Sequence, residues 1–87
     1  MSWQIVFTKQ AQMDAQKLSR AGLKQKAQIL LEILKKNPYQ NPPSYEKLLG
    51  DLKGAYSRRI NIQHRLVYEI LSDLRIIKIL SMWSHYE

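Results

Sequence analysis

The sequence predicts an α+β fold in which two N-terminal helices pack on an antiparallel sheet, with the elements in the order β-α-α-β-β-β. Two observations lead to this prediction. Apolar residues recur at helical spacing between residues 11 and 34, whereas short β-branched and aromatic runs separated by turn residues fill the chain from residue 55 onward. The 87 residues are expected to form a single domain, residues 1–87, around one hydrophobic core.

A first strand is predicted at residues 3–7, because the run Trp-Gln-Ile-Val-Phe is short, aromatic and β-branched. Thr8 is a candidate N-cap for the helix that follows. The apolar residues of this helix recur at helical spacing: Ala11, Ala15 and Leu18. Gly22 is expected to end it, either as the residue after the C-cap or within a turn between two helices.

The second predicted helix is amphipathic and ends at Asn37-Pro38, because proline cannot continue a helix. One side carries an apolar stripe: Leu23, Ala27, Leu30, Leu31 and Leu34. The other side is polar: Lys24, Gln25, Gln28, Glu32, Lys35 and Lys36. The lysines of the last turn favour the helix, since they lie at the negative end of its dipole.

A proline-rich connector follows at residues 38–44, and it can neither continue a helix nor join a central strand. It is either an inert spacer or a stiff arm that presents residues 45–49. Three strands are then predicted at residues 55–60, 65–70 and 75–83, joined by turns short enough for hairpins. We expect these strands to form an antiparallel meander, with both helices on one face and a basic, solvated surface on the other.

The composition is strongly basic. Fourteen Lys+Arg against seven Asp+Glu give a net charge of +7, which indicates an anionic partner: nucleic acid, an anionic membrane surface or an acidic protein. The alternative is a basic but inert surface. The absence of cysteine excludes disulfides and thiolate metal sites, and it is compatible with a reducing cytosol. Neither a signal-peptide pattern nor an apolar run of membrane-spanning length occurs, so we expect a cytoplasmic protein without a membrane partner.

Arginine recurs within two of the predicted strands, although residues 53–68 contain no acid. Strand alternation sends Arg58 and Arg59 to opposite faces, and Arg65 lies in the next strand. A single arginine is usually a solvated or ion-paired surface group. Three arginines in neighbouring strands without counterions are harder to explain in this way, because like charges facing each other are destabilising. The phosphate backbone of a nucleic acid would supply the missing anion.

Acid–base chemistry has few candidates in this chain. His85 follows an apolar strand and adjoins Tyr86, a second group that can carry a proton; the alternative is a frayed polar tail. His64 is predicted to be a turn or surface residue. Glu46, at the end of the proline connector, is either a general base held over the sheet or a carboxylate at the start of a one-turn helix.

No metal or cofactor site is predicted. The two histidines are far apart in sequence, cysteine is absent, and no paired carboxylates show metal-ligand spacing. The three glycines fit none of the phosphate-binding loops. An enzyme with this sequence is therefore expected to work without a metal or cofactor.

The motifs of the C-terminal half form one pattern. They are Glu46 followed by Leu48, Gly-Ala-Tyr-Ser-Arg-Arg-Ile at 54–60, His-Arg-Leu-Val-Tyr at 64–68, and the terminal pair His85-Tyr86. Together with the order of the elements, they resemble the Txe/YoeB toxins of the RelE/ParE superfamily of bacterial toxin–antitoxin systems. The resemblance implies a RelE/YoeB-like microbial RNase fold. It also implies a ribosome-dependent mRNA endonuclease that contacts ribosomal RNA, inhibits translation and is neutralised by an acidic cognate antitoxin.

The resemblance also implies roles for individual residues. The implied catalytic residues are Glu46, Arg65 and His85, supported at the substrate by Arg59, Tyr86, Arg58 and Lys53. Glu46 would take the proton from an RNA 2′-OH that attacks the adjacent phosphate, and His85 would protonate the leaving 5′-oxygen. The arginines would stabilise the charge that develops on the phosphoryl oxygens.

One segment departs from the family pattern. Many relatives carry Pro-Glu-Pro-Leu-Lys where this chain has residues 45–49. The lysine that is missing at Leu49 is a phosphate contact that Lys47 or Lys53 would replace. The orientation of Glu46 is left open by this difference.

Two other function classes remain open. A ParE-like toxin would share the fold and bind a protein target such as gyrase without RNA chemistry, although the terminal His85-Tyr86 disfavours it. A non-catalytic nucleic-acid-binding module would bind with a steep salt dependence and would not cleave. The sequence also leaves open the codon preference, the identity of the antitoxin, and whether the protein is a monomer or a homodimer.

Overall fold

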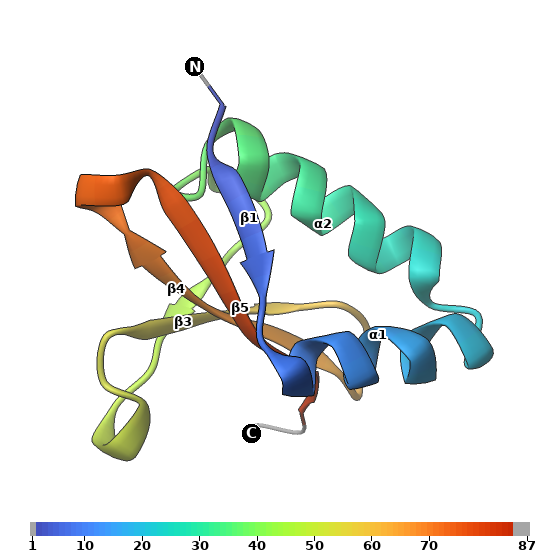
Figure 1. The fold of residues 1–87 in the computed structure, drawn as a ribbon. Coiled ribbons are helices and arrows are strands. Elements are labelled where there is room, and N and C mark those ends of the chain that lie inside the picture. The colour runs from blue at the N-terminus through green and yellow to red at the C-terminus, as the bar shows by residue number, and fades with distance from the viewer. Residues whose placement is uncertain (1, 85–87) are drawn as a thin grey trace.

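The computed structural model describes residues 2–84, in which two helices pack on a five-stranded sheet (Figure 1). The elements in chain order are β1 (Gln4–Phe7), α1 (Lys9–Arg20), α2 (Lys24–Lys36), β2 (Glu46–Lys47), β3 (Ala55–Arg59), β4 (Arg65–Leu71) and β5 (Ile76–Ser84). Short 3₁₀ turns precede β3 and β5. The predicted fold class is confirmed. No helix within residues 2–84 combines the length and the apolar character needed to cross a membrane.

The strands lie in the order β1-β5-β4-β3-β2, and β3, β4 and β5 form the predicted antiparallel meander. Two features differ from the predicted antiparallel sheet. β1 pairs with β5 in parallel, so the sheet is mixed, and the two-residue strand β2 adds an edge beside β3. A run such as residues 3–7 predicts a strand but carries no information on the direction of its partner. The segment around residue 46 is too short to show strand periodicity.

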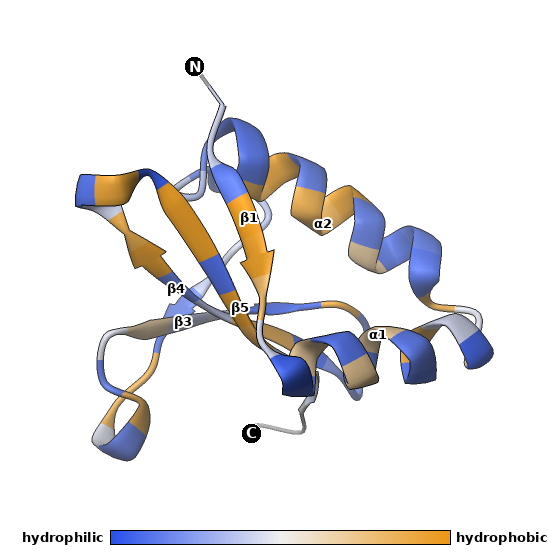
Figure 2. Cartoon of the chain, viewed as in Figure 1, coloured by the Kyte–Doolittle hydropathy of each residue, from blue (hydrophilic) through white to orange (hydrophobic). Residues whose placement is uncertain are grey.

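The core lies between the helices and one face of the sheet. Alternation in the central strands sends Leu66 and Tyr68 of β4 toward the helices, where they meet Ile77 and Ile79 of β5. The helices contribute Ala11, Leu18, Ala27, Leu30 and Leu34. Figure 2 shows apolar residues along β1 and β5 and their alternation with hydrophilic residues along both helices. Burial of this apolar surface is the main favourable contribution to folding.

α1 also satisfies backbone groups of β5 where that strand is irregular. The pairing of β5 with β4 shifts between Tyr68 and Arg65, as it does at a β-bulge. Asp14 is buried, and its carboxylate accepts a hydrogen bond from the Met82 N–H at 3.0 Å. The Thr8 hydroxyl donates to the Leu80 carbonyl at 2.9 Å. The start of α1 therefore fixes the path of the last strand.

Replacing Thr8 with valine is expected to destabilise the fold by about 1–2 kcal/mol. Thr8 is the N-cap of α1, since its hydroxyl accepts the Ala11 N–H at 3.1 Å, and the same hydroxyl bonds to β5. Valine has nearly the same shape and makes neither bond. Urea unfolding monitored by circular dichroism measures the change, and Thr8→Ser is the matched control that keeps both bonds. An unchanged unfolding midpoint for Thr8→Val would show that the cap contributes nothing.

Arg58 attaches the proline-rich connector to the sheet. The residue is only 1% exposed, and its guanidinium donates to the carbonyl oxygens of Pro38 and Pro43 and to the Tyr68 hydroxyl. The same group lies over the Tyr45 ring, 4.9 Å from its centroid. Burial raises the pKa of Tyr68, against the opposing effect of the Arg58 charge, so the phenol stays neutral and accepts the bond. Of the two predicted alternatives for the connector, an inert spacer or a stiff arm, these contacts support the stiff arm.

Candidate active site

Three strands bring one carboxylate and two guanidinium groups together on the face of the sheet that points away from the helices. Glu46 of β2 lies opposite Ser57 of β3, and Arg59 lies opposite Arg65 of β4. Ser57 and Arg59 are two residues apart and so share a face. Glu46 is held beside them because Arg58 fixes the arm that precedes it.

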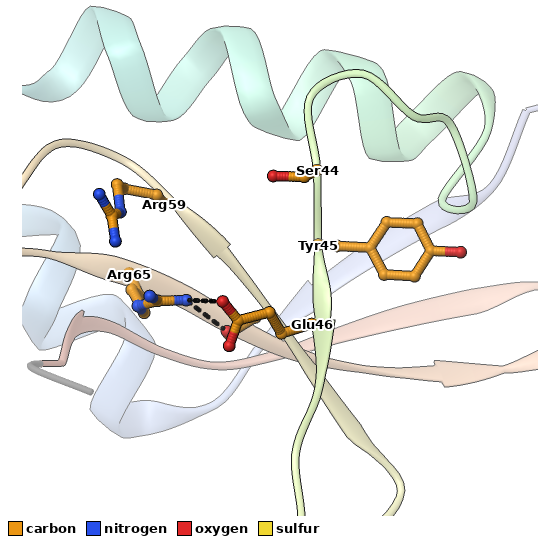
Figure 3. Close-up of a pocket in the computed structure, with 6 residues that line it drawn as sticks. Ser44, Tyr45, Glu46, Arg59 and Arg65 are labelled. Atoms are coloured by element: carbon orange, nitrogen blue, oxygen red, sulfur yellow. Dashed lines mark hydrogen bonds and ion pairs between the residues drawn. The ribbon is translucent and has the colours of Figure 1, made fainter. Parts of the chain in front are cut away.

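These side chains line a pocket of about 320 Å³. Its lining residues are Ser44, Tyr45, Glu46, Ser57, Arg59 and Arg65. Figure 3 shows Glu46 and Arg65 pointing toward each other, with Arg59 on the same side of the sheet. Two guanidinium groups against one carboxylate leave one positive charge in excess, which favours an anionic ligand.

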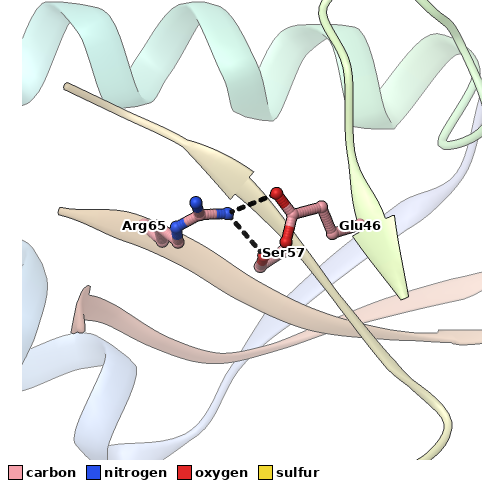
Figure 4. A network of polar contacts seen from close by, with 3 residues as sticks. All are labelled: Glu46, Ser57 and Arg65. Carbon is pink, nitrogen blue, oxygen red and sulfur yellow. Dashed lines mark hydrogen bonds and ion pairs between the residues drawn. The ribbon is translucent and has the colours of Figure 1, made fainter. Parts of the chain in front are cut away.

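The ion pair between Glu46 and Arg65 is asymmetric. The Arg65 NH1 group lies 3.4 Å from Glu46 Oε1, and the side chain of Arg65 is 10% exposed whereas that of Glu46 is 66% exposed. Arg65 also donates to the Ser57 hydroxyl at 3.2 Å (Figure 4). A pair with one solvated partner contributes at most about 1 kcal/mol. Glu46 can therefore leave Arg65 at little cost, while Arg65 stays fixed in the strand.

Comparison with known proteins identifies the family of the chain. A family model described as a YoeB-like toxin of bacterial type II toxin–antitoxin systems matches residues 7–86. The chain belongs to this family. It is a type II toxin of the YoeB/RelE group by that membership, and the resemblance seen in the sequence is confirmed.

Individual relatives agree with this assignment. The chain is 37% identical over 59 residues to a YoeB toxin from Synechocystis sp., a match that covers 68% of this chain and 66% of that protein. It is similar in structure to a YoeB/ParE toxin from Agrobacterium tumefaciens, with a TM-score of 0.85 and 28% identity over 95% of this chain and 99% of that one. A YoeB–YefM complex from Staphylococcus aureus gives a TM-score of 0.80 and 36% identity over 97% and 98%.

The structure brings together three of the side chains predicted for the site of this YoeB-like toxin, namely Glu46, Arg59 and Arg65. Glu46 lies in an edge strand and not at the start of a one-turn helix. Its orientation, which the sequence left open, is toward Arg65 (Figure 3). His85 and Tyr86 lie outside the described residues. The described part of β5 ends at Ser84, which pairs with Arg65 in the sheet.

Two predicted substrate contacts lie elsewhere in the structure. Arg58 is buried on the helical side, and its donors bind the connector and Tyr68, so the predicted contact with substrate does not agree with its position. Lys53 is not part of the lining of the site pocket; with Lys47, Leu48 and Leu49 it lines a separate hollow. Strand alternation predicted that Arg58 and Arg59 point to opposite faces of the sheet, but it did not predict which of the two is buried.

His64 closes the turn before β4, in agreement with one of its two predicted positions, since its carbonyl accepts the Ile60 N–H at 2.8 Å. The predicted surface position is wrong: the residue is only 5% exposed, and its ring stacks on that of Trp83, with 3.9 Å between the centroids and 22° between the planes. Because the partner lies 19 residues away at the end of β5, no local pattern around His64 predicts this contact.

Sequence reasoning also missed Ser57, which is fully buried beneath the pocket and contacts Arg65. Its spacing of two from Arg59 was the available signal, since residues at that spacing share a strand face. Within residues 2–84, no group of three histidine, aspartate or glutamate side chains is arranged to hold a metal ion.

Proposed function

We propose that this YoeB-like toxin is an endoribonuclease that cleaves mRNA on the ribosome, with protein side chains acting as general acid and base. The observation that carries the proposal is the convergence of the Glu46 carboxylate with Arg59 and Arg65 in one pocket of net positive charge. A phosphodiester beside a 2′-OH fits this set, because it needs a base for the hydroxyl and cations for the phosphoryl oxygens.

The first step of the proposed reaction is the exchange of anions at Arg65. The scissile phosphate takes the position of the Glu46 carboxylate as the partner of the guanidinium, and the exposed Glu46 side chain is released to accept a proton. The 2′-OH then loses its proton to Glu46 while its oxygen attacks the adjacent phosphorus. Arg65 and Arg59 stabilise the charge on the two nonbridging oxygens.

The second proton transfer completes the cleavage. As the bond from phosphorus to the 5′-oxygen breaks, His85 donates a proton to that oxygen, and the products are a 2′,3′-cyclic phosphate and a 5′-OH. The pairing of Ser84 with Arg65 supports this role, since the chain continues to His85 from a point beside the pocket. Each positioned acid or base contributes about 10²–10⁴-fold to such a reaction. Tyr86 is proposed to support the same transfer.

Partners of the toxin follow from its charge and its family. With a net charge of +7, the protein is expected to bind ribosomal RNA through phosphate contacts and an acidic cognate antitoxin through the same basic surface. The S. aureus relative forms a complex with YefM, and a YoeB dimer is known from the same organism. We propose a cognate antitoxin and a homodimer for this chain on that basis.

Mapping of mRNA 5′ ends in a translating extract tests the proposed function. The purified protein is expected to produce discrete cuts within translated codons, and these cuts should disappear when ribosomes are removed. The His85→Ala variant should cut about 10²-fold more slowly. Intact mRNA in the presence of folded protein would contradict the proposal, and a simultaneous loss of DNA supercoiling in cells would favour a ParE-like action on gyrase.

A further inference from the structure

We infer that Ser57 is a positioning residue for Arg65: a neutral acceptor that keeps the guanidinium aimed into the pocket after Glu46 has left it. This inference rests on the proposed function and adds to it a residue that the resemblance did not supply. The geometry that carries it is the shared NH1 group of Arg65, which lies 3.2 Å from Ser57 Oγ and 3.4 Å from Glu46 Oε1 (Figure 4).

Ser57 occupies the centre of the site. In the sheet register it lies between Glu46 on β2 and Val67 on β4, and it is completely buried. Arg65 lies opposite Arg59, so its side chain reaches Ser57 along the diagonal of the strand pair. A residue in the middle of a paired strand moves little, and the hydroxyl therefore gives the guanidinium a fixed point of reference.

The neutrality of the hydroxyl is what makes this position useful. A carboxylate at residue 57 would orient Arg65 equally well, but it would also cancel the positive charge that the phosphoryl oxygens require. A serine hydroxyl accepts the hydrogen bond and leaves the charge intact. Glu46 cannot orient Arg65 throughout the proposed reaction, because its carboxylate leaves the guanidinium and accepts the proton of the 2′-OH.

The expected effect falls on the chemical step. In Ser57→Ala the guanidinium loses the hydroxyl that orients its NH1 group, so kcat should fall by about tenfold to 100-fold while KM stays within about twofold. Ser57→Thr keeps a hydroxyl on a β-branched residue that strands accept, and it should recover most of the lost kcat. Ser57→Asp should be at least as impaired as Ser57→Ala, although it offers a stronger acceptor.

The decisive experiment is single-turnover cleavage of ribosome-bound mRNA by the wild type and these three variants, with circular dichroism to show that each is folded. Ser19→Ala, on the exposed side of α1, is the control for loss of a serine hydroxyl away from the pocket. A threonine variant as slow as the alanine variant, or a loss confined to KM, would overturn the role of Ser57 while leaving the proposed function intact.

A wild-type protein that does not cleave would instead overturn the proposed function and, with it, the kinetic role of Ser57. The contact itself is then measured by a double-mutant cycle of Ser57→Ala and Arg65→Met in urea unfolding. If the two substitutions change the unfolding free energy non-additively, Ser57 still orients Arg65 in the pocket, which would then bind another anion. If their effects are additive, Ser57 does not orient Arg65 at all.

Discussion

Replacing Arg65 with alanine is expected to slow mRNA cleavage by about 10²–10³-fold, because the pocket loses the donor that stabilises charge on the phosphoryl oxygens. Arg65 lies at the centre of the polar contacts of the site, with Glu46 and Ser57 within 3.4 Å of its NH1 group. Arg65→Lys keeps the charge but lacks the forked donor, so an intermediate rate is expected. Single-turnover cleavage of ribosome-bound mRNA measures both effects.

The stability of this variant must be measured beside its rate. Arg65 is mostly buried, and its removal is expected to cost about 1–2 kcal/mol of unfolding free energy, which leaves the protein folded. Arg20→Ala is the matched control, since it removes an exposed arginine from the end of α1. Equal losses of rate in the two variants would mean that overall charge, and not the pocket, accounts for the effect of Arg65.

The second large effect is expected on stability. Arg58→Met should lower the free energy of unfolding by about 3–5 kcal/mol, because the buried Pro38 carbonyl and Tyr68 hydroxyl and the partly buried Pro43 carbonyl lose their donor. Domains of this size have a total stability of about 5–15 kcal/mol, so a large part of it depends on one side chain. Activity should also fall, since the arm that presents Glu46 is no longer fixed.

The neighbouring residue Arg59 provides a control, because its replacement is expected to affect cleavage and not stability. Arg59 is exposed in the pocket, so Arg59→Met should change stability by less than about 0.5 kcal/mol while slowing cleavage. Urea unfolding and single-turnover rates, measured on both variants, separate the two roles. If Arg58→Met unfolded at the wild-type urea concentration, the buried hydrogen bonds would not hold the connector.

The parts of the fold that were predictable from sequence depend on local patterns. The Thr8 cap, the apolar stripe of α2 and the hairpins of the meander each depend on residues within a few positions of one another, and each is confirmed. The parallel pairing of β1 with β5 joins segments about 70 residues apart, and nothing within either segment specifies it.

The candidate site shows the same division. Strand alternation predicted that Arg58 and Arg59 point to opposite faces of the sheet. Arg58 is the buried one because its guanidinium binds carbonyl oxygens of the connector, which lie 15 to 20 residues earlier in the chain. The stacking of His64 on Trp83 is likewise set by the end of another strand. The family resemblance placed Glu46 and Arg65 in one site, but the departure at residues 45–49 left the orientation of the carboxylate open, and only the structure shows its pairing with Arg65.

The chemistry of the cut tests the role of the pocket most directly. A short mRNA with a single 2′-deoxy nucleotide at a mapped cleavage site should resist the toxin there and be cut normally at other sites, because Glu46 would have no 2′-OH to deprotonate. The 5′ fragment of the unmodified mRNA should end in a 2′,3′-cyclic phosphate. Equal cutting of the deoxy and ribo forms would contradict the proposed attack by the 2′-OH and the role of Glu46 as its base.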